Sequence, residues 1–83
     1  MRNELLIIKK YLILKGCASH IRYLLIEENN TYGIKIIYEG EENEVVLKNQ
    51  TRDDVVLLIK ILSDGLTFPI ELPYILEELF FNV

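Results

Sequence analysis

The chain of 83 residues is long enough for one domain and too short for two. Hydrophobic residues make up 51% of it and charged residues 27%, a composition that excludes intrinsic disorder. No apolar run approaches the roughly 18 residues of a membrane span, and a single cysteine suits a reducing compartment. We therefore expect one soluble, cytoplasmic domain over residues 1–83, with no membrane partner.

The net charge of −4 is distributed unevenly along the chain. Residues 1–35 contain six basic and three acidic residues, whereas residues 36–83 contain three basic and ten acidic ones. Phosphate binding needs a clustered positive surface, and aliphatic residues dilute the lysines of the first segment. The sequence thus predicts no direct contact with nucleic acid. The asymmetry is typical either of an ordinary solvated surface or of a surface that orients a partner.

Four apolar segments in the first half of the chain are separated by turn residues, and each is predicted to form a strand. The segments are 5–14, 21–26, 32–38 and 45–48. Connections this short join antiparallel strands, since parallel pairing needs a crossover of about a dozen residues or more. Residues 1–50 are therefore predicted to form a four-stranded antiparallel meander.

After residue 50 the apolar period becomes that of a helix. Thr51 precedes two acids and is the predicted N-cap of a first helix. The buried stripe of this helix is predicted to contain Val55, Leu58, Ile59 and Leu62. Gly65 is expected to end it as the C′ residue at positive φ. Pro73 then fits the first turn of a second helix that runs to about Phe81.

These elements predict the fold class and the internal organisation of the chain. The order ββββαα indicates an α+β fold in which the two helices pack on the sheet. Residues 1–50 form the β-meander of this single domain, and residues 51–83 form its two-helix C-terminal part.

Few residues in the chain are candidates for catalysis. His20 is the only histidine and Cys17 the only cysteine, and they lie three residues apart in the first turn region. Such a pair can supply a nucleophile and a base, or half of a metal site, but no further Cys or His completes a zinc set. The acids of segment 39–44 lack the spacing and the central glycine of a calcium loop. We predict a non-enzyme with no catalytic, cofactor-binding or metal-binding residue.

The predicted strands carry more apolar side chains than two short helices can cover. A sheet with helices on one face should expose polar residues on the other, yet the first three strands are apolar on both sides. Continuous exposed apolar surface usually marks an association site, unless the helices split across the two faces and cover both. The predicted interface residues on the uncovered face are Leu5, Ile7, Tyr23, Leu25 and Ile37.

Three patterns in the later part of the chain are similar to those of a known family. They are Tyr32-Gly33-Ile34-Lys35-Ile36, the Leu-rich stretch 55–62, and Pro69-Ile70-Glu71-Leu72 followed by an acidic, apolar helix. Over residues 31–81 the chain resembles short clostridial-type proteins catalogued as a domain of unknown function. Their pattern runs Tyr-Gly-Ile into a strand, then a Leu-rich helix, then Pro-x-x-Leu and a final helix. That family has no assigned activity, so the resemblance implies no functional residue.

Two functional hypotheses from different classes fit these features. The first is a protein-binding or regulatory module that self-associates as a homodimer through apolar sheet surface. The second is an acidic inhibitor of phage or mobile-element type, whose acidic half binds a basic nucleic-acid-binding protein. The first hypothesis predicts association that is insensitive to salt, and the second a complex that weakens steeply with ionic strength.

Overall fold

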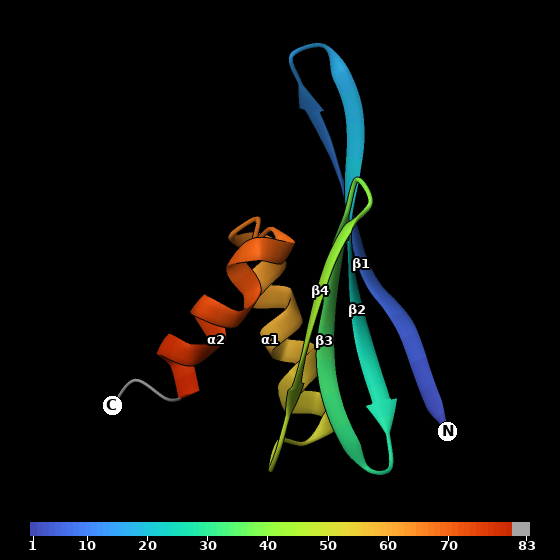
Figure 1. The fold of residues 1–83 in the computed structure, drawn as a ribbon, viewed down its shortest axis with the longest axis vertical. Coiled ribbons are helices and arrows are strands. Elements are labelled where there is room, and N and C mark those ends of the chain that lie inside the picture. The colour runs from blue at the N-terminus through green and yellow to red at the C-terminus, as the bar shows by residue number, and fades with distance from the viewer. Residues whose placement is uncertain (81–83) are drawn as a thin grey trace.

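The computed structural model describes residues 1–80 and shows one antiparallel sheet with helices on one of its faces (Figure 1). The strands β1 (Arg2–Leu14), β2 (Cys17–Glu28), β3 (Thr31–Tyr38) and β4 (Glu41–Leu47) lie side by side in chain order. They are followed by α1 (Arg52–Asp64), the 3-10 turn η1 (Pro69–Glu71) and α2 (Leu72–Phe80). The predicted α+β fold with the order ββββαα is confirmed. The predicted end of the second helix at Phe81 lies outside the described residues.

All three hairpins of the meander have two-residue loops with positive φ at both positions. The loop residues are Lys15–Gly16, Asn29–Asn30 and Glu39–Gly40, with φ between 47° and 81°. Loops of this geometry match the right-handed twist of the strands they connect. Because each loop is so short, pairing continues up to it, and the strands are longer than the apolar segments that predict them.

The core lies between the helices and one face of the sheet. Residues opposite each other in the register share a face, so Tyr23 lies beside Ile36, and Leu25 beside Ile34. The sheet contributes Ile21, Tyr23, Leu25, Ile34, Ile36 and Leu47 to this core, and the helices contribute Val55, Leu58, Ile59, Leu62, Leu72 and Leu76. The predicted buried stripe of the first helix is thus confirmed. We call this side of the sheet the helix face and the other side the outer face.

Tyr23 connects the centre of the sheet to the segment between α1 and η1. Its side chain is fully buried, and its hydroxyl donates a hydrogen bond to the Thr67 carbonyl oxygen at 2.9 Å. Burial raises the pKa of Tyr23 to about 12, with a smaller contribution from the negative charge of Glu71. The tyrosine is therefore neutral in the folded protein at every ordinary pH.

This raised pKa predicts a loss of stability in alkali. Tyrosine in the unfolded chain ionises near pH 10, while Tyr23 in the folded chain holds its proton to about pH 12. The contribution of Tyr23 to the free energy of unfolding is then complete below pH 10 and falls as the pH rises toward 12. Urea titrations across this range should show the fall in the native protein and a weaker one in Tyr23→Phe. If the free energy of unfolding fell with pH by the same amount in the native protein and in Tyr23→Phe, the burial of the Tyr23 hydroxyl would be contradicted.

Helix α1 begins at the predicted cap and ends differently from the prediction. Thr51 Oγ1 accepts a hydrogen bond from the Asp54 N–H at 3.1 Å, which confirms the N-cap. Gly65 has φ −83°, so its predicted positive φ is wrong, and Leu66 takes that conformation instead with φ 53°. The N–H groups of Leu66 and Thr67 close the helix through bonds to the carbonyls of Ser63 and Leu62, respectively. The half-buried Leu66 side chain packs against the core, and this burial offsets the cost of the left-handed conformation.

The two ends of α1 predict opposite mutational effects. Thr51→Ala should lower the free energy of unfolding by about 0.5–2 kcal/mol, because it removes the acceptor of an end N–H group. Gly65→Ala should raise it by about 0.4–1 kcal/mol, because alanine restricts the unfolded chain. A Cβ at Gly65 meets no atom outside its immediate neighbours closer than 3.8 Å. Urea denaturation midpoints test both changes, and a lower midpoint for Gly65→Ala would show that the helix end needs a glycine.

Candidate interaction surface

The hairpin of β1 and β2 extends past the rest of the sheet. Pairing between β2 and β3 ends at Ile21 with Tyr38, whereas β1 and β2 remain paired as far as Leu14 with Cys17. Figure 1 shows this hairpin, in blue, standing above β3, β4 and the helices. At a rise of about 3.3 Å per residue, the four further pairs carry it about 13 Å beyond its neighbours. We call residues 11–20 the arm.

One side of the arm and its base combines apolar and cationic side chains. Strand alternation places Lys9, Tyr11 and Ile13 on the outer face, and Arg22 lies opposite Lys9 in the register. Tyr11 is 74% exposed and Ile13 is 79% exposed, the highest values among the large hydrophobic side chains of the strands. These four residues, Lys9, Tyr11, Ile13 and Arg22, are named the arm face. It offers a partner two large apolar groups beside two positive charges.

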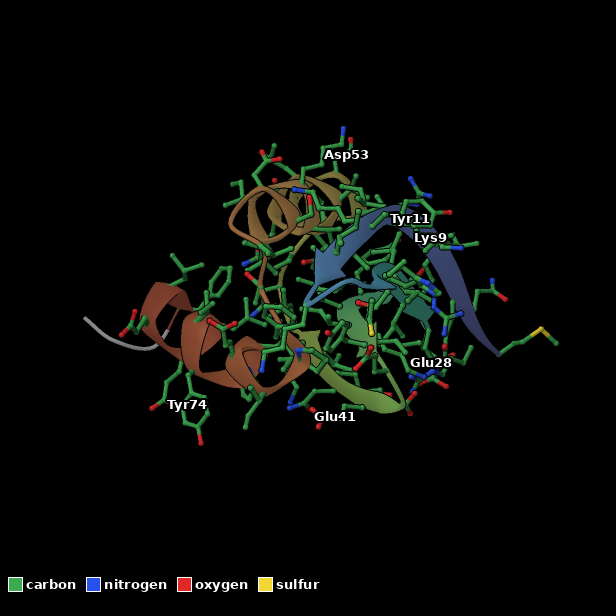
Figure 2. The ribbon with its side chains drawn as sticks, turned by 90° about the horizontal axis from the view of Figure 1, so that it is seen from above. Lys9, Tyr11, Glu28, Glu41, Asp53 and Tyr74 are labelled. Carbon is green, nitrogen blue, oxygen red and sulfur yellow. The ribbon has the colours of Figure 1, made fainter. Side chains whose placement is uncertain are left out.

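The exposed Tyr11 ring has cationic and aromatic neighbours. The Lys9 Nζ lies 5.4 Å from the centre of the Tyr11 ring, a cation–π arrangement. On the neighbouring strand, the His20 ring lies at 6.1 Å with its plane tilted by 60°. Figure 2 shows Lys9 and Tyr11 next to each other at one side of the molecule. These contacts position an aromatic side chain that the rest of the domain does not cover.

A hollow lies at the base of the arm, where the arm meets the turn between β3 and β4. Its volume is about 310 Å³, and it is lined by Ala18, Ser19, His20, Arg22, Ile37, Glu39 and Gly40. The only acid in this lining is Glu39. From Leu5 to Ile26 the sequence contains four basic residues and no acid, so the hollow lies at the edge of a cationic region. A partner side chain that enters it meets both the apolar Ile37 and the positive Arg22.

Ion pairs cover the other end of the outer face. Arg2 on β1 binds Glu44 on β4 at 2.7 Å, and Lys35 on β3 binds Glu4 on β1 at 3.1 Å. The hydrogen bond from Lys35 lowers the pKa of the Glu4 carboxyl. Arg2 and Glu44 lie on the two edge strands, and Lys35 and Glu4 lie on β3 and β1, so both ion pairs reach across the outer face. Ile26 lies on this face and is only 1% exposed, while Leu6 and Val46 on the same face are 52% and 50% exposed.

The structure does not bring the five predicted interface residues together on an uncovered face. Tyr23 and Leu25 are 0% exposed because the helices cover the face on which they lie. Leu5 lies opposite Leu25 at the margin of that same face. Of the five, Ile37 lies on the outer face, where it is half-buried and lines the hollow. The predicted assignment of Tyr23 and Leu25 to an exposed surface is therefore wrong.

A β-bulge accounts for the position of Ile7. The register between β1 and β2 shifts between Leu6 and Ile8, which breaks the strict alternation of side chains along β1. As a result, both Ile7 and Ile8 pack against the core cluster, and Leu6 is left on the outer face. Alternation extrapolated through a bulge assigns every later residue of the strand to the wrong side.

The structure separates the two residues that sequence analysis weighed as a catalytic pair. Cys17 is exposed at the end of the arm, and His20 is half-buried beside Tyr11. Residues three apart in a strand point to opposite faces, so the thiol and the imidazole do not face each other. Residues 1–80 contain no group of three or more His, Cys, Asp or Glu side chains placed to hold a metal ion.

Sequence analysis missed the arm face as a surface. The sequence feature that could have indicated it is the segment from Leu5 to Ile26, which contains lysine and arginine but no acidic residue. The charge of that segment is visible in the sequence, but its projection from the sheet depends on where β3 and β4 end.

No helix within residues 1–80 has the length and apolar composition needed to cross a membrane. Comparison with protein-family models, curated proteins and solved structures gives no match to this chain.

Proposed function

We propose that this protein is a protein-binding module that self-associates as a homodimer through the arm and the outer edge of β1. The main observation that supports this proposal is that β1 is a long edge strand and that Tyr11 and Ile13, near its end, are exposed. Edge strands present unpaired N–H and C=O groups and attract further strands unless charges protect them. The opposite edge, β4, carries Glu41, Glu42 and Glu44, whereas residues 11–14 of β1 carry no charge.

The size of the domain supports the same proposal. A chain of 83 residues buries a limited fraction of its surface. Burying an exposed side chain such as Tyr11 or Ile13 contributes roughly 1.5–3 kcal/mol. A two-fold dimer provides that burial twice, with the same surface on both copies, and is the commonest form of self-association.

Sedimentation equilibrium at tens of micromolar protein tests this function. The native chain should sediment as a dimer, and Ile13→Lys should shift it to monomer while leaving the urea midpoint of the fold nearly unchanged. Ile37→Lys should also weaken the dimer more than the fold, since Ile37 lines the hollow at the base of the arm. Leu57→Lys is the matched control, because Leu57 is a 59% exposed apolar residue on α1. A native chain that sediments as a clean monomer would overturn the proposal.

A further inference from the structure

We infer that a second copy pairs with the free edge of β1 in antiparallel register, with the Tyr11 residues of the two copies opposite each other on a two-fold axis. The inference rests on the proposed self-association and specifies its geometry. The two four-stranded sheets then form one continuous sheet, with β1 of each copy at its centre. Three properties of β1 support this register: the direction of its backbone groups, the position of its bulge and the order of its charges.

Three residues of β1 direct their backbone groups away from β2. A two-residue turn is closed by a hydrogen bond between the residues that flank it, here Leu14 and Cys17, which lie opposite each other. The backbone groups of Leu14 therefore point toward β2. Because this direction alternates along an antiparallel strand, the N–H and C=O groups of Lys9, Tyr11 and Ile13 point outward. Since β1 is the edge of the sheet, these groups have no strand partner within residues 1–80.

The part of β1 that can pair regularly is centred on Tyr11. The bulge leaves Ile7 without an opposite residue on β2, and the strand ends at Leu14. Residues 8–14 lie between these two limits and alternate without interruption. A bulge disrupts a ladder and protects a strand edge, so pairing with a second copy is confined to this segment. Two identical segments overlap most when the two-fold axis passes through their middle residue, which is Tyr11.

The charges of β1 disfavour the neighbouring registers. Residues directly opposite each other in an antiparallel pair share a face of the sheet, so the axis must pass through a residue and not between two. With the axis at Lys10, the Lys10 side chains of the two copies would lie opposite each other. With the axis at Leu12, Lys9 would lie opposite Lys15 of the second copy. Like charges directly opposite each other are destabilising.

With the axis at Tyr11, the opposite residues are compatible. Lys9 lies opposite Ile13 of the second copy, so a cation faces an apolar side chain. The two Tyr11 rings meet on the axis, and each has the His20 ring of its own chain at 6.1 Å on its other side. Aromatic side chains opposite each other stabilise a sheet. The three outward-pointing residues of each copy form hydrogen-bonded pairs, which exchange two bonds each and so provide about six backbone bonds.

The two copies fit beside each other without overlap. Because β1 is the last strand of the sheet, an axis perpendicular to the sheet at its free edge lies outside the domain. Tyr11 is the first residue of the arm, and the arm stands above β3, β4 and the helices (Figure 1). The rotation therefore places the helices of the two copies on opposite sides of the axis. Both copies use the same segment of β1, so the assembly closes at two.

Engineered disulfides test the register directly, in a Cys17→Ser background that removes the natural thiol. Tyr11→Cys should link to its own copy on oxidation by glutathione disulfide, because the Cα atoms of such a pair lie about 5.5 Å apart. An equimolar mixture of Lys9→Cys and Ile13→Cys should form a mixed disulfide dimer. Ile13→Cys alone should not link, since its two thiols would be displaced by about 13 Å along the strands. Non-reducing gel electrophoresis and mass spectrometry measure the products.

Two substitutions at one position test the same register by charge. Ile13→Lys places a cation opposite Lys9 of the second copy, and Ile13→Glu places an anion there. The dimer dissociation constant of Ile13→Glu should therefore be lower than that of Ile13→Lys by about tenfold or more. The native dimer should be insensitive to salt, because no charged side chains lie opposite each other across the axis.

A matched pair of double variants separates this local effect from net charge. Adding Lys9→Glu to Ile13→Lys should restore the dimer, because the two substituted positions are again oppositely charged. Adding Lys48→Glu to Ile13→Lys makes the same change in net charge at an exposed position outside the arm, and should not restore it. Circular dichroism confirms that each variant is folded.

The outcomes distinguish the inference from the proposed function. If the native chain is a dimer but the Lys9→Cys and Ile13→Cys mixture gives no mixed disulfide, the register is overturned and the self-association stands. The same conclusion follows if Ile13→Cys links to itself, or if Ile13→Glu weakens the dimer as much as Ile13→Lys. If the native chain is a monomer, both the register and the self-association are overturned.

Discussion

Leu25→Ala should lower the free energy of unfolding by about 2–5 kcal/mol, the range for removing a buried leucine side chain. Leu25 is fully buried in the central strand β2, between Leu5 on β1 and Ile34 on β3. The truncation leaves a cavity under the helices, and a sheet paired on both sides closes such a cavity only partly. Urea denaturation measures the loss, which should be many times that of Ile13→Ala at an exposed position.

This result also separates a core residue from an interface residue. A core role predicts that Leu25→Ala lowers the unfolding midpoint equally at low and high protein concentration. An interface role predicts an effect on dimer dissociation that exceeds the effect on the monomer. A near-native unfolding midpoint for Leu25→Ala would contradict the placement of Leu25 under the helices.

Gly33→Ala is expected to cost about 1–3 kcal/mol or more, the range for adding a group to a tightly packed position. A Cβ at Gly33 would lie 2.6 Å from the Val45 carbonyl oxygen and 3.1 Å from the Val46 Cα. Both atoms belong to the backbone of β4, so no side-chain rotation relieves the overlap and β4 itself must move away. Urea denaturation should show a clear fall in the midpoint.

Gly65→Ala is the matched control, since it makes the same chemical change where the structure has room for it. The movement of β4 in Gly33→Ala has a second consequence, because β4 carries the Glu44 that binds Arg2 across the outer face. We therefore expect the variant to make that end of the outer face more accessible, which hydrogen exchange in β4 can measure. An unchanged midpoint would show that β3 and β4 are not in close contact at Gly33.

The number of strands explains why the arm, rather than the whole outer face, is the candidate surface. Where the sheet has four strands, the ion pairs of Arg2 and Lys35 reach across the outer face, and the exposed fractions of its large apolar residues run from 1% for Ile26 to 52% for Leu6. Beyond Ile21 only two strands remain, and Tyr11 and Ile13 are 74% and 79% exposed. The large apolar side chains of the outer face are thus more exposed on the arm than on the four-stranded part of the sheet.

The sequence by itself determined the order and type of the elements, because the signals involved are local. A two-residue loop such as Lys15–Gly16 depends on its own backbone preferences, and the Thr51 cap bonds to an N–H group only three residues away. The helical spacing of apolar residues after residue 50 is likewise a local pattern, because it is set by residues three and four positions apart. These signals predict a meander and two helices without knowledge of any long-range contact.

Only the tertiary structure decided which face the helices cover and which apolar residues stay exposed. Alternation shows that Tyr23 and Leu25 share a face, but it is symmetric between the two faces, and the choice depends on packing against α1 and α2. The bulge after Leu6 and the positive φ of Leu66 arise in the same way, since both place a side chain against the core. The arm projects because β3 and β4 are short, so its exposure is determined by strands elsewhere in the chain.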